Sequence, residues 1–161
     1  MGYFYRENML SGDMLEFKSN SLIGRMIRCK TDKKVNHSSL IVKMLGRIFT
    51  LESLGSGIEL HLLSNRVRDF NGKIYYYPLK DDFYRDAIAG WALDQIDKKY
   101  DYPGVFANLF GKVNVDGRLY FCSEYVQAAY KHAGLIKQND KACFPGEFEK
   151  YNIHKERVRI K

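Results

Sequence analysis

The chain has 161 residues, of which 45% are hydrophobic and 28% charged, with 26 Lys and Arg against 19 Asp and Glu. This composition excludes a disordered or fibrous chain, and the length is ample for one buried core. We expect a single domain over residues 1–161, because no repeat, linker or low-complexity stretch interrupts the chain. The net charge of +7 is compatible with an anionic partner or with solubility alone.

Several classes of protein are disfavoured at once. No apolar run approaches the ~20 residues that cross a bilayer, and the N-terminal stretch lacks the apolar segment of a secretory signal. The three cysteines, Cys29, Cys122 and Cys143, are too irregularly spaced for a disulfide framework or a paired-cysteine zinc site. Without a phosphate loop, a metal-ligand cluster or a nucleic-acid-binding motif, we predict no cofactor, no metal and no nucleic-acid partner.

Turn and periodicity signals predict mainly strands in the first half of the chain. Gly12 and Asp13 form a turn before a short strand over 14–17, and a helix follows over 22–27 with its cap within 19–21. Apolar runs separated by turn residues predict four more strands, over 38–45, 48–54, 58–63 and 73–79.

The second half is predicted to be mainly helical. Asp81 and Asp82 could cap a helix over 83–98, and further helices are predicted over 105–110 and 121–133, the last ending at Gly134. The basic tail over 152–161 alternates roughly, as an exposed edge strand does. Together these elements predict an α+β fold, an antiparallel sheet with segregated helices.

Cys122 is the cysteine with the most informative position, because it begins a predicted helix. The free N–H groups and dipole of a helix N-terminus favour a thiolate and supply donors for an oxyanion. Taken alone, Cys122 fits equally a small buried cysteine on an apolar helix face, and we assign Cys29 and Cys143 to that structural role.

His37 and Glu52 stand on the two strands of a predicted hairpin. His37 begins the most apolar strand, and a turn near residues 45–47 would return Glu52 to the same end of the hairpin. A carboxylate there could accept from one imidazole nitrogen and leave the other to face a thiol. Taken alone, His37 is typical of a surface or capping histidine, and Glu52 is typical of an exposed strand carboxylate. With Cys122 they form a joint pattern typical of nucleophile, base and orienting acid.

Several stretches of the chain carry a family resemblance. They are Gly12-Asp13-Met14-Leu15, 22–28, Asn36-His37-Ser38-Ser39 with 40–42, Leu51-Glu52 with 57–58, Tyr100-Asp101-Tyr102, 121–126 and Pro145-Gly146-Glu147-Phe148. In this order they resemble the circularly permuted branch of the NlpC/P60 superfamily of papain-like cysteine hydrolases, the YiiX/YebB-like group, in which the histidine strand precedes the cysteine helix.

The resemblance implies a permuted papain-like (NlpC/P60) fold, with an antiparallel sheet or small barrel packed against helices. It implies Cys122 as nucleophile, His37 as general base and Glu52 as orienting acid, with the Cys122 backbone N–H as an oxyanion donor. The reaction would be acyl transfer by a hydrolase or acyltransferase, at a cell-wall-like peptide amide or at an acyl ester or thioester. The resemblance therefore implies that the substrate is a peptide, a peptidoglycan-like polymer or an acyl lipid.

An alternative from another functional class stays open. The same fold could be a non-catalytic binding module that recognises an anionic polymer or lipid surface through the basic tail and the lysine pairs at 33–34 and 98–99. Many relatives in the resembled family carry export signals. Since none is recognised here, we expect a cytoplasmic or phage-associated location.

Overall fold

One sheet and several helices make up the described part of the chain, which comprises residues 3–20, 34–54, 57–96 and 121–161 of a computed structural model. The elements in chain order are α1 (Tyr3–Asn8), β1 (Met14–Ser19), β2 (His37–Met44), β3 (Arg47–Leu54), β4 (Gly57–Leu62), α3 (Leu63–Asp69), β5 (Gly72–Tyr77), α4 (Arg85–Leu93), α6 (Phe121–His132), the 3-10 turn η1 (Phe148–Tyr151) and β6 (Val158–Arg159).

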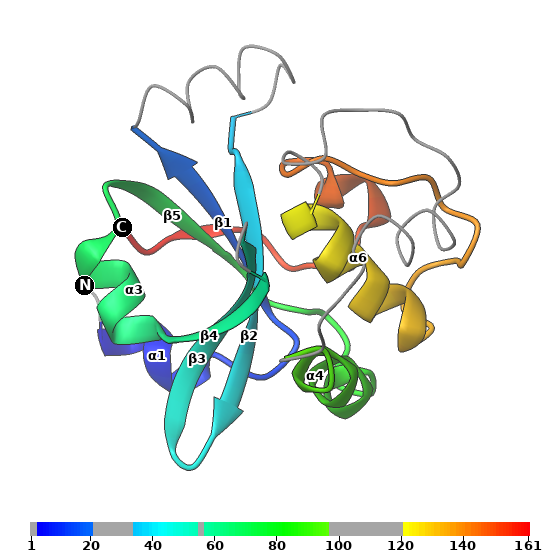
Figure 1. Ribbon diagram of the computed structural model, residues 1–161, viewed down its shortest axis with the longest axis horizontal. Helices are drawn as coiled ribbons and strands as arrows, with labels where there is room; N and C mark the ends of the chain where they lie inside the picture. The colour runs from blue at the N-terminus through cyan, green and yellow to red at the C-terminus, as the bar shows by residue number, and fades with distance from the viewer. Residues whose placement is uncertain (1–2, 21–33, 55–56, 97–120) are drawn as a thin grey trace.

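The six strands form one sheet in the order β4-β3-β2-β1-β5-β6. Every neighbouring pair is antiparallel, so the predicted α+β class is confirmed. β1 lies inside the sheet, where Met14 is opposite Leu40 of β2 and Tyr77 of β5. Figure 1 shows α4 and α6 on one side of the sheet and α1 and α3 on the other.

Alternation along the strands divides the apolar residues between two clusters. Met14, Leu40 and Leu51 are buried with α4 and α6, in a cluster that includes Ile88 and Val126. The opposite cluster lies under α3 and contains a second set of buried residues: Met9, Leu15, Phe17, Ile41, Leu63, Ile74 and Tyr76. The sheet is therefore covered on both faces, and its strands are largely buried.

A buried ion pair fixes the turn before β1. Asp13 accepts hydrogen bonds from the backbone N–H of Leu10 (2.9 Å) and Leu79 (2.8 Å), and from the Tyr76 hydroxyl (2.6 Å). The Arg85 guanidinium donates to the same carboxylate from α4 (2.7 Å). The predicted Gly12-Asp13 turn is thus present, and it joins β1, β5 and α4.

The helix predicted over 83–98 begins later than expected. Asp81 accepts from the backbone N–H of Phe83 (2.9 Å), as a cap would, but α4 starts only at Arg85 and Tyr84 at its N-cap makes no side-chain capping bond. Neither Asp81 nor Asp82 therefore caps α4. Asp82 instead accepts from Arg85 Nε (2.7 Å), because the Arg85 side chain is directed toward both Asp82 and Asp13.

The remaining predicted elements have mixed outcomes. The strand predicted over 58–63 ends at Leu62, and the chain turns at once into α3, which the sequence did not indicate. The helix predicted over 121–133 is confirmed as α6, and the edge strand of the tail is confirmed in the shorter form of β6. The helices predicted over 22–27 and 105–110 lie outside the described residues.

Among the helices of the described ranges, none has the length and apolar character needed to cross a membrane.

Candidate active site

His37 is held at the very start of β2, as predicted. Its position is pinned by β1, because the Asn36 backbone N–H donates to the Phe17 carbonyl (2.9 Å) and Asn36 Oδ1 accepts from the Ser19 N–H (2.8 Å). The Phe17 ring lies beside the imidazole, with 5.2 Å between ring centroids. The ring of His37 therefore has a defined place at the end of the sheet, with 14% of the side chain exposed.

Glu52 returns to His37 along the β2–β3 hairpin, as the turn position predicts. His37 Nε2 and Glu52 Oε2 are 2.8 Å apart. The carboxylate is fully buried and also accepts from the Thr50 hydroxyl (2.9 Å). Its position is thus fixed from its own strand as well as from β2.

Arg66 of α3 is a site residue that the sequence did not reveal. Its Nε and Nη2 donate to the two oxygens of Glu52 at 2.7 and 2.8 Å, a bidentate pair that favours the ionised carboxylate. The guanidinium also lies over the rings of Phe17 (5.2 Å) and Phe70 (5.3 Å). A buried acid needs a cation, but nothing local in the sequence selects Arg66 as that cation.

Cys122 lies in the first turn of α6, close enough to His37 to raise the pKa of the imidazole. Because Nε2 is used by Glu52, the ring's Nδ1 is the atom left for the thiol. Cys122 is 7% exposed. The structure therefore brings together all three residues that the sequence singled out.

Electrostatics in this group favour a charged imidazole. Burial would by itself lower the pKa of His37, but the neighbouring Cys122 and the Glu52 carboxylate outweigh it and raise the pKa to about 9. Burial would likewise raise the pKa of Glu52, yet the hydrogen bonds and charges of His37 and Arg66 lower it to about 2. At neutral pH the pair is an imidazolium facing a carboxylate.

Cys143, His61 and His154 take no part in this group. Cys143 is fully buried, and burial raises the pKa of its thiol to about 12, as expected for a structural cysteine. Cys29 lies outside the described residues. His61 pairs with Glu59 on β4, and burial lowers the pKa of His154 to about 3.

Two further carboxyl groups are buried on the helical side of the sheet. Burial raises the pKa of both Glu16 and Glu124 to about 7. Glu16 of β1 accepts from the Gly146 backbone N–H (2.6 Å), and Ser123, next to Cys122, donates to the Cys143 carbonyl (2.6 Å). These bonds hold the segment before η1 against both β1 and the start of α6.

The described residues do not offer a metal site. In the ranges that the structure covers, no group of three His, Cys, Asp or Glu side chains is placed to hold an ion. Glu52, the carboxylate paired with His37, already accepts hydrogen bonds from Arg66, Thr50 and His37. Both of its oxygens are therefore engaged in hydrogen bonds within the protein.

Comparison with known proteins identifies the fold. No family model and no curated protein matches the sequence. Among solved structures, the fold is similar to that of the metalloprotein YiiX of Escherichia coli O157:H7, with a TM-score of 0.60 and 18% identity over 80% of this chain and 68% of that one. The chain thus has a YiiX-like α+β fold, in agreement with the predicted architecture.

Proposed function

We propose that this protein is a cysteine hydrolase or acyltransferase, with Cys122 as the nucleophile, His37 as the acid–base and Glu52 as the residue that positions His37. One observation carries the proposal. The imidazole of His37 makes a hydrogen bond with a buried, arginine-paired carboxylate, and the thiol of Cys122 is near enough to raise the pKa of the same imidazole. A thiol, an imidazole and a carboxylate connected in this order are the arrangement that activates a nucleophile.

The first half of the reaction forms an acyl-enzyme. The thiolate sulfur of Cys122 attacks a carbonyl carbon, an S–C bond forms, and the carbonyl electron pair moves to oxygen. When the tetrahedral intermediate collapses, the bond to the leaving group breaks, and the His37 imidazolium supplies the leaving group's proton. Raising the pKa of His37 to about 9 keeps that proton available at neutral pH.

The second half regenerates the thiol. Neutral His37 takes a proton from water, or from an acceptor alcohol or amine, whose oxygen or nitrogen attacks the thioester carbon. The S–C bond then breaks, and the sulfur leaves as a thiolate that faces the newly charged imidazolium. Glu52 stabilises this cation and is held ionised by Arg66, so the carboxylate needs no proton at any step.

The start of α6 supplies the electrostatic partner of the oxyanion. Backbone N–H groups in the first turn of a helix have no carbonyl partner within the helix. The N–H of Cys122 lies in that turn, beside the sulfur that attacks. A carbonyl oxygen that becomes negative next to Cys122 would therefore meet this donor and the positive end of the helix dipole.

Covalent labelling tests the proposal. A thiol-reactive acyl probe should modify the wild-type protein at Cys122, as located by peptide mass spectrometry, and Cys122→Ala should abolish this labelling. Cys29→Ala and Cys143→Ala should label as the wild type does. His37→Ala should slow the labelling at least about a hundredfold, since the imidazolium that faces the thiolate and supplies the leaving group's proton is lost. Equal labelling of the wild type and Cys122→Ala would refute the proposal.

A further inference from the structure

The tip of the β2–β3 hairpin carries a leucine that the fold does not use. Leu45 is 96% exposed. It has φ 51°, and Gly46 after it has φ 70°, so both turn residues are left-handed. Such two-residue hairpin turns favour Asn-Gly. Asn152, the other non-glycine residue with positive φ in the described ranges, is of a type that tolerates this conformation.

Leu45 therefore breaks two local rules at one position. Its backbone conformation is unfavourable for leucine, and its side chain gains nothing from burial. Positions that depart from local rules in this way are commonly those that serve a contact outside the fold. The side chain of Leu45 is thus available for burial against a binding partner.

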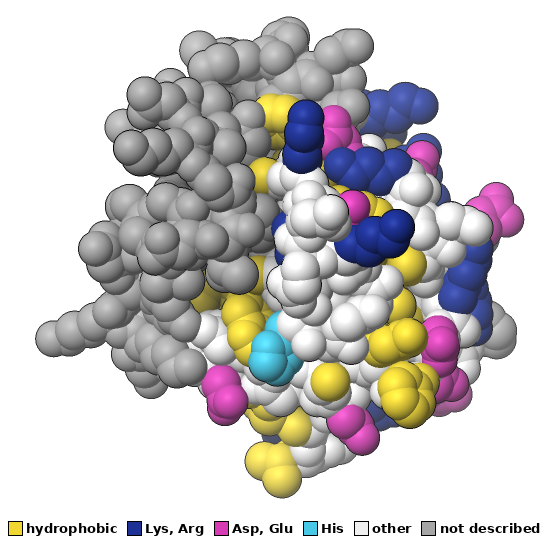
Figure 2. Space-filling view, turned by 90° about the vertical axis from the view of Figure 1, so that its right-hand side faces the viewer, with side chains coloured by type: hydrophobic (Ala, Val, Ile, Leu, Met, Phe, Trp, Pro, Cys, Tyr) yellow, Lys and Arg dark blue, Asp and Glu magenta, His cyan; other side chains and the backbone are white. Residues whose placement is uncertain are grey.

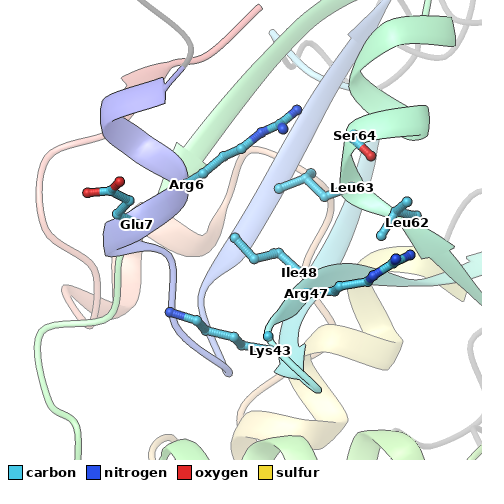
Figure 3. A pocket seen from close by; sticks show the side chains of 9 residues that line it. Arg6, Glu7, Lys43, Arg47, Ile48, Leu62, Leu63 and Ser64 are labelled. Carbon is cyan, nitrogen blue, oxygen red and sulfur yellow. The ribbon is translucent and has the colours of Figure 1, made fainter.

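Three cations surround a groove next to this tip. Arg6, Lys43 and Arg47 are exposed, and none of them has an ion-pair partner among the residues that the structure describes. They line a groove of about 470 Å³ whose other lining residues are Glu7, Gly46, Ile48, Leu62, Leu63 and Ser64. In Figure 3, Arg6 extends alongside Leu63, whereas the Glu7 carboxylate points away from Arg6 and Arg47.

This cationic site differs from the basic tail that the sequence suggested. In the tail, Arg157 lies near Glu149 (3.6 Å) and donates to the Tyr77 hydroxyl (3.3 Å). Arg159 and Lys161 donate to backbone carbonyls. These three tail cations are thus engaged within the protein, while Lys155 of the tail is exposed. The three cations around the groove have no ion-pair partner among the described residues.

We infer that the hairpin tip docks on an anionic phospholipid membrane, with Leu45 inserted among the lipid chains and Arg6, Lys43 and Arg47 facing the phosphates. An exposed apolar side chain beside a groove lined by cations combines the two forces that hold peripheral proteins on such surfaces, burial of apolar area and attraction to anionic headgroups. We name this set of four residues the hairpin patch.

A second exposed apolar side chain lacks the cationic surroundings of the hairpin patch. Phe83 is 85% exposed, but its neighbours in the chain include three acids, Asp81, Asp82 and Asp86, against two cations, Lys80 and Arg85. Figure 2, which views the side on which α4 and α6 lie, shows acidic side chains among hydrophobic ones at its lower end. Negative charge there would repel an anionic membrane, so Phe83 offers an internal control.

The docked orientation places the candidate active site away from the membrane. β2 runs from His37 at the site to Met44 beside the tip, roughly 25 Å along an extended strand. Docking would therefore tether the protein and leave Cys122 facing away from the lipid. The inference does not depend on the proposed catalytic function.

Vesicle co-sedimentation tests the inference with the full chain. The wild type should bind phosphatidylcholine vesicles that contain phosphatidylglycerol, bind vesicles of phosphatidylcholine alone weakly, and lose binding as salt screens the charges. Leu45→Asn should reduce binding at least tenfold, while its urea midpoint stays equal or rises because Asn suits the turn. Arg6→Gln and Arg47→Gln should each reduce binding about fivefold.

Matched variants complete the experiment. Phe83→Asn removes an equally exposed apolar side chain, and Lys137→Gln removes an exposed charge elsewhere, so both should bind as the wild type does. No binding to anionic vesicles, or wild-type binding by Leu45→Asn, would overturn the inference. Binding to duplex DNA that is lost in the same Arg variants but kept in Leu45→Asn would assign the patch to nucleic acid and overturn it as well.

Discussion

Two buried carboxylates of this protein are each paired with an arginine, yet they have different surroundings. Asp13 accepts from Arg85, from the Tyr76 hydroxyl and from two backbone N–H groups. Glu52 accepts from Arg66 and Thr50, and its remaining partner is an imidazole. Both acids are almost completely inaccessible to solvent.

The difference lies in where each network ends. The partners of Asp13 are an arginine, a tyrosine and backbone N–H groups, none of which contacts a candidate nucleophile in the described part of the chain. This network therefore only joins the turn before β1 to β5 and α4. The hydrogen bonds of Glu52 include His37, and the neighbouring Cys122 thiol and Glu52 carboxylate together raise the pKa of that imidazole. The same pairing of acid and arginine thus stabilises a turn at one place and positions a reactive group at the other.

The largest expected effect is on stability, at Asp13. Asp13→Ala leaves the Arg85 guanidinium without its buried partner, and removing one member of a buried pair costs about 3–5 kcal/mol. Urea unfolding should show a correspondingly lower midpoint, with the same slope if the unfolded state is unchanged.

Asp82→Ala is the matched control, because Asp82 binds the same arginine from an exposed position. This variant should unfold close to the wild-type midpoint. A loss at Asp82 as large as that at Asp13 would show that burial does not distinguish the two carboxylates.

At Glu52 the expected effect is mainly on reactivity. Glu52→Gln removes the negative charge that helps to raise the pKa of His37, so that pKa should fall. In the wild type, the reaction should decline as pH rises through about 9, where the imidazolium loses its proton. In Glu52→Gln the decline should begin at lower pH, and the rate at neutral pH should be about a hundredfold lower.

The pH dependence of acyl-probe labelling measures both changes. Glu59→Gln is a suitable control, because Glu59 is opposite Glu52 on β4 but pairs with His61. It should leave the profile in place. An unchanged alkaline limb in Glu52→Gln would mean that the carboxylate does not act on His37.

The smallest effect is expected at Cys143. Its thiol is fully buried, and its pKa is raised to about 12, so it should contribute no labelling at neutral pH. Cys143→Ala should cost only roughly 1 kcal/mol of stability through lost packing. Labelling that falls in Cys143→Ala at unchanged stability would transfer the reactive role from Cys122 to Cys143.

The sequence by itself determined the local geometry of this protein. The turn at residues 45–46 sets the hairpin register, and that register returns Glu52 to His37. The apolar periodicity and Gly134 similarly defined α6 and placed Cys122 in its first turn. Such features could be predicted because each depends on residues that are close together in the chain.

Only the tertiary structure decided which distant groups meet. The sequence could not show that Arg66 is the cation for Glu52, nor that Arg85 of α4 pairs with Asp13. It also did not show that three cations with no ion-pair partner among the described residues line one groove beside the hairpin tip, whereas Arg157 of the tail lies near Glu149. Packing decides which charged groups pair. A charge removed from water needs a partner, and only the tertiary fold determines which two groups are buried side by side.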